Sequence, residues 1–271
     1  MTARRILAVL LVALVLEGAQ FGYRYRNRSS AGSANRRWGM YEYEMQNPAE
    51  DPPDAWEKTE FAFARLRYRD IYGRARWGTD ANKSERQFIQ GLRRLTRVNA
   101  RSVEQIVDID SDEIYDWPWL YAVAIGDWNL SPQHVIRLRN YFQRGGFLMV
   151  DDFHNEREWG DFTAGVHRIL GDPVVQEIPD GHAAFHLVYD LKERMHIPGL
   201  NVVNSSYPWE RGGVGYHFRG VFDAKGRMQI AACFNMDLGD AWEWADIPEY
   251  PEKLASHAYR IGVNYVVSMT H

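Results

Sequence analysis

Residues 138–153 have the sequence LRNYFQRGGFLMVDDF, and this stretch predicts the architecture of the chain. Its first half continues a helix, because Ser131-Pro132 supplies an N-cap with proline at the first helical position and apolar side chains follow at helical spacing. Gly145-Gly146 ends that helix, and residues 147–150 form an apolar run typical of a buried strand. A similar apolar run, residues 120–125, precedes the helix. A strand, a helix and a strand within about 30 residues form a right-handed crossover, so the two strands are predicted to be parallel.

The rest of the chain adds elements on both sides of this unit. Strands are predicted at 61–68, 103–107, 200–203, 214–222 and 228–234, the last two joined by the turn Asp223-Ala224-Lys225-Gly226. Helices are predicted after a capping box of Asn82 and Glu85, from about 156 to 170, and from about 252 to 267. Together these elements predict one α/β domain, residues 59–271, with a doubly wound, mainly parallel sheet and an added antiparallel hairpin.

The stretch 138–153, together with NMDLGDAWE at 235–243 and RIGVNY at 260–265, resembles the bacterial family called domain of unknown function 4159. The resemblance covers most of the chain from Phe61 onwards. It implies a flavodoxin-like fold similar to that of class I glutamine amidotransferases. It also implies frequent membrane segments among members, and genes that often lie near those of chaperone-type ATPases and von Willebrand A domains. No activity comes with the family name.

Charge is distributed unevenly along the 271 residues. Residues 1–37 hold seven arginines and one acidic residue, Glu17, whereas the remaining residues hold 25 basic and 35 acidic side chains, a net charge of about −10. Nucleic-acid binding requires a basic face, so this acidic body argues against a nucleic-acid partner.

The N-terminal region predicts the location of the protein. Arg4-Arg5 precede eleven apolar residues, Ile6 to Leu16, a length that fits the core of a signal peptide better than a membrane span. Residues 1–23 are therefore predicted to be a signal peptide or an uncleaved membrane anchor, with a buried N-terminal helix as the alternative. Residues 24–58 are predicted to be a polar linker or arm. The protein is expected in the periplasm or secreted, or anchored by its N-terminal segment, which would be its sole membrane contact.

Candidate site residues follow the predicted strands, because ligands of open parallel sheets bind beyond the carboxyl ends of the strands. Asp127-Trp128 follow one strand, and Asp151-Asp152 and His154 follow the next. In an amidotransferase, the second turn would carry a nucleophilic cysteine. The single cysteine, Cys233, lies instead in a predicted hairpin strand and is interpreted as a core residue, so hydrolysis of glutamine by a Cys-His-Glu triad is excluded.

Asp151 and Asp152 are the candidate catalytic residues. If the backbone stays extended there, the two carboxylates point to opposite faces of the sheet. One of them would then face a ligand, and the other would cap the next helix or meet an arginine. A chemical role for one aspartate and a purely capping role both stay open.

Two further groups are candidates for ligand or metal binding. His182 and His186 are four residues apart, which places them on one face of either a helix or a strand. With a carboxylate such as Asp151 or Asp127 they can hold a divalent metal, and the alternative is two surface histidines. The second group departs from a calcium-binding loop at its glycine and glutamate positions. It is interpreted as a hydrogen-bonded loop that can line the cleft of Asp151, with Asn235, Asp237, Asp240, Trp242 and Glu243 as binding residues.

Two functions fit these observations. The first is an envelope-associated module that binds a partner protein, a small ligand or a glycan through its acidic and aromatic rim. The alternative is a hydrolase that uses Asp151 or Asp152, with or without a divalent metal at His182 and His186, on an envelope substrate such as a glycan. Convergence of the two histidines on the Asp151 turn would favour the hydrolase.

Overall fold

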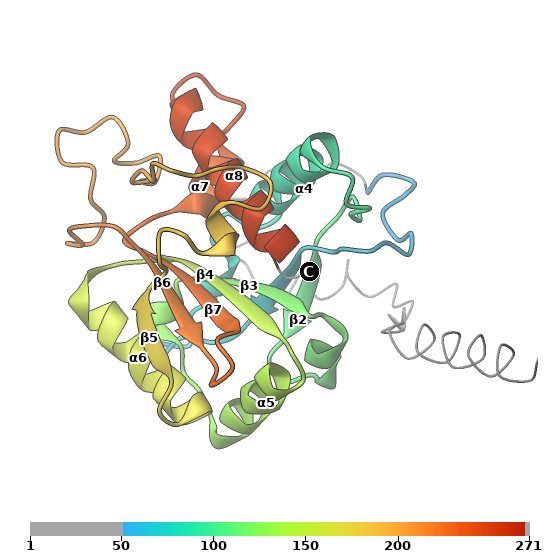
Figure 1. Ribbon diagram of the computed structural model, residues 1–271, viewed down its shortest axis with the longest axis vertical. Coiled ribbons are helices and arrows are strands. Elements are labelled where there is room, and N and C mark those ends of the chain that lie inside the picture. The colour runs from blue at the N-terminus through green and yellow to red at the C-terminus, as the bar shows by residue number, and fades with distance from the viewer. Residues whose placement is uncertain (1–50, 269–271) are drawn as a thin grey trace, which may run out of the picture.

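The computed structural model describes residues 51–268. Their seven strands form one mixed sheet in the order β2-β1-β3-β4-β7-β6-β5 (Figure 1). The strands are β1 Ala64–Arg67, β2 Gln105–Asp108, β3 Trp119–Val123, β4 Phe147–Phe153, β5 Val174–Glu177, β6 His217–Phe222 and β7 Met228–Phe234. The predicted signal peptide or anchor, and the predicted linker up to residue 50, lie outside the described residues.

The sheet is parallel from β2 to β7 and antiparallel at its β5-β6 end, which confirms the predicted class of fold. Numbered among themselves, the parallel strands have the order 2-1-3-4-5, which is the flavodoxin-like doubly wound order. The hairpin of β6 and β7 closes through the predicted turn, where Gly226 has φ 81° and donates its N–H to Asp223 O at 2.9 Å. The closer likeness to glutamine amidotransferases stays a prediction.

Helices cover both faces of the sheet (Figure 1). One face carries α4 Lys83–Leu95, the short α7 Leu238–Glu243 and α8 Glu252–Ser268, and the other carries α5 Pro132–Gln143 and α6 Asn155–Leu170. Alternate strand residues supply the two cores: Tyr121 and Met149 pack with α4, α7 and α8, whereas Leu120 and Leu148 pack with α5 and α6. Short 3-10 helices occur at Arg76–Gly78 (η2), Asp112–Asp116 (η3), Ile125–Asp127 (η4) and Ala183–Phe185 (η5).

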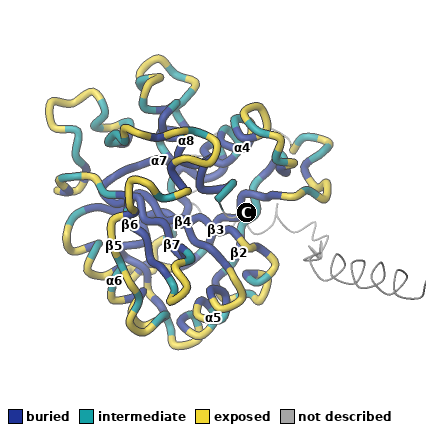
Figure 2. Tube along the Cα trace, in the orientation of Figure 1, coloured by how far each residue is buried: buried dark blue, intermediate teal, exposed yellow. Residues whose placement is uncertain are grey.

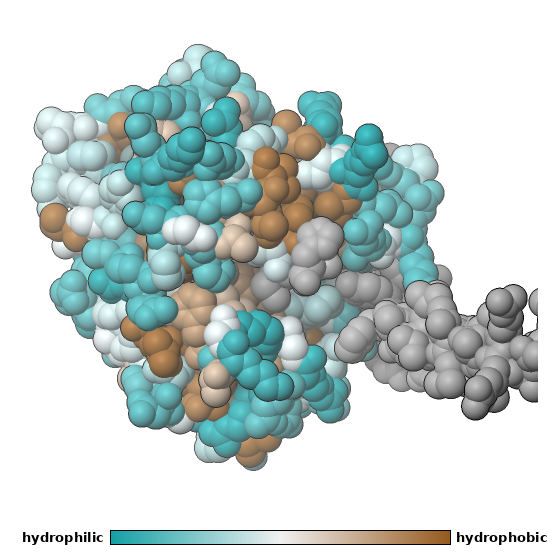
Figure 3. All heavy atoms as spheres, viewed as in Figure 1, coloured by the Kyte–Doolittle hydropathy of each residue, from teal (hydrophilic) through white to brown (hydrophobic). Residues whose placement is uncertain are grey.

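Burial follows this layered arrangement (Figure 2), and every residue of β3, β4 and β7 is buried. Hydrophilic side chains cover most of the face shown in Figure 3. Among the described residues, no helix is both long and apolar enough to span a membrane.

Three details of the secondary structure differ from the sequence-based expectation. Residues 200–203 form turns rather than a strand, because Gly199 O accepts the N–H groups of both Val202 and Val203 and so closes the backbone on itself. Strand β5 was not expected; it is a short, mostly exposed edge strand with no strong alternation of polarity. The expected loop at 235–243 contains α7, whose N-cap Asp237 accepts the N–H of Asp240 at 2.8 Å.

Candidate functional site

A bulge at the end of β4 sets the geometry of the acidic turn. Val150 pairs with Ala232 and Phe153 with Phe234, so β4 has one more residue than β7 across this interval. Asp152 takes up the extra residue with φ 49°, a left-handed conformation that is uncommon outside glycine. The simple alternation of side chains expected for an extended strand is therefore interrupted at this turn.

Asp151 lies inside the protein and caps a helix, but not the next one along the chain. Its Oδ2 accepts hydrogen bonds from Leu238 N at 2.7 Å, Gly239 N at 2.9 Å and Tyr121 Oη at 3.0 Å, so it caps α7, which follows the neighbouring strand β7. Its Oδ1 has no hydrogen-bond partner among the described residues, and the side chain is fully buried. Burial raises the pKa of Asp151 to about 8, and the neighbouring charge of Asp152 acts in the same direction.

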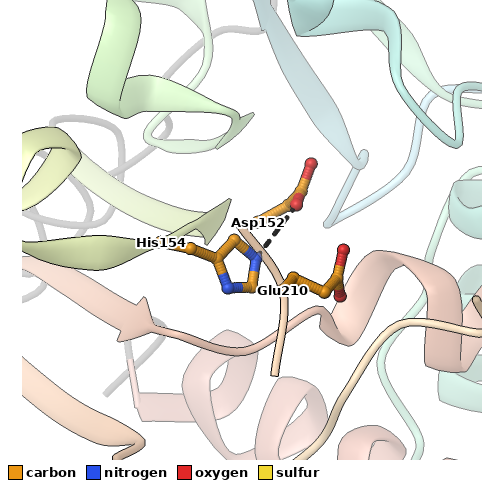
Figure 4. A group of neighbouring side chains, drawn as sticks. All are labelled: Asp152, His154 and Glu210. Carbon is orange, nitrogen blue, oxygen red and sulfur yellow. Dashed lines mark hydrogen bonds and ion pairs between the residues drawn. The ribbon is translucent and has the colours of Figure 1, made fainter. Parts of the chain in front are cut away.

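Asp152 belongs to a second group, which it forms with His154 and Glu210 (Figure 4). One ligand atom from each of the three buried side chains lies within 4.8 Å of those of the other two, and His154 Nε2 lies 3.3 Å from Asp152 Oδ1. The imidazole lies beside both carboxylates in Figure 4, while its Nδ1 has no described partner. Glu210 is held in place because its Oε1 accepts Gly199 N at 2.9 Å.

Arg211 connects this group to the rest of the site. Its Nη2 lies 2.8 Å from both the Oδ1 and the backbone oxygen of Asp152, and its Nε lies 3.5 Å from Glu158. Burial alone would raise the pKa of Asp152, but the charge of Arg211 and the contact with His154 hold that pKa well below its usual range.

A third group of carboxylates adjoins the first two. One oxygen each of Asp80, Asp240 and Glu243 also lies within 4.8 Å of the others. Gly199 shows how close the groups of Glu210 and Asp240 lie, because carboxylate oxygens of both surround it. A methyl group added at Gly199 would meet Glu210 Oε1, Asp240 Oδ2 at 2.8 Å and Asp237 Oδ2 at 3.0 Å, so Asp237 lies beside both groups. We call the combined set of seven carboxyl groups the acidic centre: Asp80, Asp151, Asp152, Glu210, Asp237, Asp240 and Glu243.

The acidic centre gathers seven carboxyl groups around two arginines, Arg65 and Arg211. Burial, followed by mutual repulsion, raises the pKa values of Asp80 and Asp237 well above normal, and burial raises the pKa of Asp240 to about 6. Arg65 and Arg211, which lower the pKa values of Asp80 and Asp152, also contact Glu85 and Glu158 respectively. Buried carboxylates in this excess require either bound protons or a bound cation.

Asp127 and Trp128 lie at the same edge of the sheet but serve other contacts. Asp127 accepts hydrogen bonds from Arg76 Nη1 at 2.5 Å and Arg157 Nη1 at 2.8 Å. Burial would raise its pKa, but Arg157 and Arg76 together lower it. Trp128 is buried against Gly165 of α6. The structure therefore places both residues in packing and ion-pair contacts beside the acidic centre.

The residues of the 235–243 stretch that do not belong to the acidic centre make structural contacts. Asn235 joins loops, since its Oδ1 accepts Asn155 N at 2.9 Å and its Nδ2 donates to Gly215 O at 2.6 Å. Trp242 is fully buried in the core formed with α4. Cys233 is likewise fully buried within β7, and burial raises the pKa of its thiol.

The structure does not bring His182 and His186 to the acidic turn. The ring of His182 packs on Phe222, which pairs with Met228 at the amino end of β7. The acidic centre lies at the carboxyl end of that strand, about 20 Å away at 3.3 Å per residue. His186 instead contacts Asp190 Oδ1 at 2.7 Å and Asp180 O at 2.6 Å.

Three residues of the site were not among the candidates named from the sequence. Asp80 lies between η2 and α4, in the segment after β1 that the strand-end rule places at this edge, but it was not singled out. Glu210 and Arg211 lie in the irregular segment that precedes β6 and were not expected there. No periodic pattern marks these positions, although the Gly212-Gly213 pair that follows was a signal for a tight turn beside them.

Comparison with known proteins identifies a family whose description names no activity. A family model described as "Domain of unknown function (DUF4159)" matches residues 62–269, which include every strand of the sheet and the whole acidic centre. No curated protein matches the chain.

Proposed function

Because this chain belongs to the family of the domain of unknown function DUF4159, whose description carries no activity, we propose a function from the site itself: the protein is a divalent-cation-binding module. The cation is held by Asp152, His154 and Glu210 at the carboxyl edge of the sheet. The family match spans the sheet and these three residues. The proposal itself rests on the geometry and charge of the three residues.

The chemistry of the three side chains supports a metal site. Two carboxylates with one imidazole form a ligand set that suits Zn²⁺ or Mn²⁺. A cation about 2.1 Å from each ligand atom holds them roughly 3.4 Å apart, so a modest contraction of the present group completes the site. His154 is only 2% exposed, and its Nε2 lies 3.3 Å from Asp152 Oδ1, so a proton or a cation has to separate this nitrogen from the carboxylate.

The charge of the surroundings carries the proposal. Seven carboxyl groups converge on a region where Arg65 and Arg211 are shared with other acids. A divalent cation would allow several of these groups to ionise at neutral pH, because it supplies the charge that the arginines lack. By binding both Glu210 and Asp152, the cation would also hold the segment before β6 against the end of β4.

A binding role fits better than hydrolysis because the ligands are closed off from solvent. Asp152 and His154 are each 2% exposed, so a substrate does not reach them in this conformation. One observation favours the alternative, a metal-dependent hydrolase. Asp151, next to the ligand Asp152, has a pKa of about 8, which is in the range of a general acid or base.

The location and partners in this proposal follow the sequence. The N-terminal apolar run supports a place in the cell envelope. The acidic body supports a protein, small-ligand or glycan partner rather than nucleic acid.

Cation titration of the purified, chelator-treated full-length chain tests the proposal. By calorimetry with Zn²⁺ and with Mn²⁺, we expect one site per chain that is weakened in His154→Gln and in Glu210→Gln. The loss should be at least tenfold, because even partners outside the coordination sphere cost about that much. Circular dichroism of each variant reports whether it folds.

His182→Gln is the matched control, since it removes another imidazole of the same chain from the opposite edge of the sheet. It should bind the cation as the unmodified protein does. Unchanged binding by folded His154→Gln and Glu210→Gln would overturn the proposed site. Loss of binding in His182→Gln alone would instead support the metal site at His182 and His186.

A further inference from the structure

A cavity of about 510 Å³ lies between α8 and the segment at 190–195, and none of its lining residues belongs to the acidic centre. Its size falls in the range of sites for small molecules. Leu191 and Met195 contribute apolar surface, and α8 contributes Lys253, Ser256, His257 and Arg260.

His257 is a buried polar group in the wall of this cavity. It is 5% exposed, and its Nε2 accepts a hydrogen bond from Met195 N at 3.3 Å. The neutral ring therefore carries its hydrogen on Nδ1, for which no partner occurs among the described residues. A donor is thus available to a ligand in the cavity.

Three cationic side chains act on His257. Burial lowers its pKa to about 4, and the charges of Arg260, Lys253 and Arg194 act in the same direction. Arg194 is also paired with Asp180 outside the cavity.

Acidic residues line the cavity as well. Asp190 is engaged by His186 and Lys192, whereas Glu193 and Glu252 are exposed, as are Lys253 and Arg260. The spacing of Lys253, Ser256, His257 and Arg260 places them on one face of α8, so this face gathers hydrogen-bond donors beside the exposed carboxylates.

We infer that this cavity binds a phosphorylated small molecule whose phosphate contacts His257, Lys253 and Arg260. A phosphate group accepts several charge-assisted hydrogen bonds at once, which matches the imidazole N–H, the ammonium and the guanidinium. The hydroxyl of Ser256 is a further donor in the same wall. Glu193 and Glu252 would face the rest of the ligand, where they favour amino or hydroxyl groups and repel a second phosphate.

Nuclear magnetic resonance of the full-length chain, labelled at histidine, tests this inference with inorganic phosphate as the probe. The His257 ring signal, assigned by loss in His257→Gln, should shift saturably. Its pKa should rise from about 4 towards 6.5 when phosphate is present, because a bound anion offsets the three cations. Asp190, Lys192, Glu193 and Glu252 also face the cavity, so each titration is compared with and without phosphate at equal ionic strength.

A double variant, Lys253→Gln with Arg260→Gln, should bind phosphate at least tenfold more weakly, which corresponds to about 1.4 kcal/mol. Lys225→Gln, in the exposed β6-β7 turn, is the matched control and should bind as before. A shift that does not saturate, equal binding by the folded double variant, or an equally tight response to acetate would each overturn the inference.

Discussion

The buried carboxyl group of Asp151 should make the stability of the cation-free protein fall as the pH rises. Its pKa is about 8 in the folded chain, against 3.8 for the free side chain. The folded state therefore holds a proton that the unfolded state releases. The resulting stabilisation is complete below about pH 4 and is lost progressively up to about pH 8.

Replacing Asp151 by asparagine isolates this effect. The amide oxygen can accept the same hydrogen bonds from Leu238 N, Gly239 N and Tyr121 Oη, and the side chain no longer titrates. The unpartnered amide nitrogen adds a cost that does not depend on pH. Between pH 5 and pH 7, the free energy of unfolding should fall by roughly 2–3 kcal/mol more in the unmodified protein than in the variant, at about 1.4 kcal/mol per pH unit.

Urea denaturation in the presence of a chelator measures this difference, with an unchanged m value as the check that the unfolded states are comparable. Asp172→Asn, on an exposed aspartate, is the control and should follow the unmodified protein at every pH. A constant difference between Asp151→Asn and the unmodified protein from pH 5 to pH 8 would refute the reasoning. Asp240, with a pKa of about 6, should leave part of the slope in the variant.

Two further predictions concern the neighbourhood of the site. Arg211→Gln should destabilise the chelator-treated protein by about 3 kcal/mol, because it removes the guanidinium from the buried Asp152 and leaves that carboxylate with the His154 contact, and Mn²⁺ should reduce that loss by supplying the missing charge. Equal losses with and without Mn²⁺ in thermal unfolding would contradict this. Gly165→Ala should cost about 1–3 kcal/mol, because its methyl group would meet the buried Trp128 ring. Gly160→Ala, on the same helix with open space around it, should be neutral or stabilise the protein by up to about 1 kcal/mol; equal effects of the two alanines would rule out the clash.

The sequence was sufficient for the layered fold because its strongest signals are local. The cap at Ser131, the helical spacing after it and the Gly145-Gly146 stop determine α5, and the apolar runs on either side determine β3 and β4. A crossover of this length between β3 and β4 is right-handed and makes the two strands parallel. The arrangement of the central strands could therefore be predicted from the sequence. The sequence also placed Asp151 and Asp152 at the end of β4 and separated Cys233 from any nucleophile position.

Only the tertiary structure assembled the acidic centre. Asp80 and Glu210 come from irregular segments far apart in the chain, and no periodicity relates them to β4. The bulge at Asp152 is equally hidden, because an aspartate rather than a glycine adopts the positive φ. Regular elements are encoded by spacing along the chain, whereas the convergence of loop carboxylates depends on how the packed layers bring their ends together. For that reason Asp151, predicted to cap the next helix or to face a ligand, caps α7 instead, more than eighty residues further along.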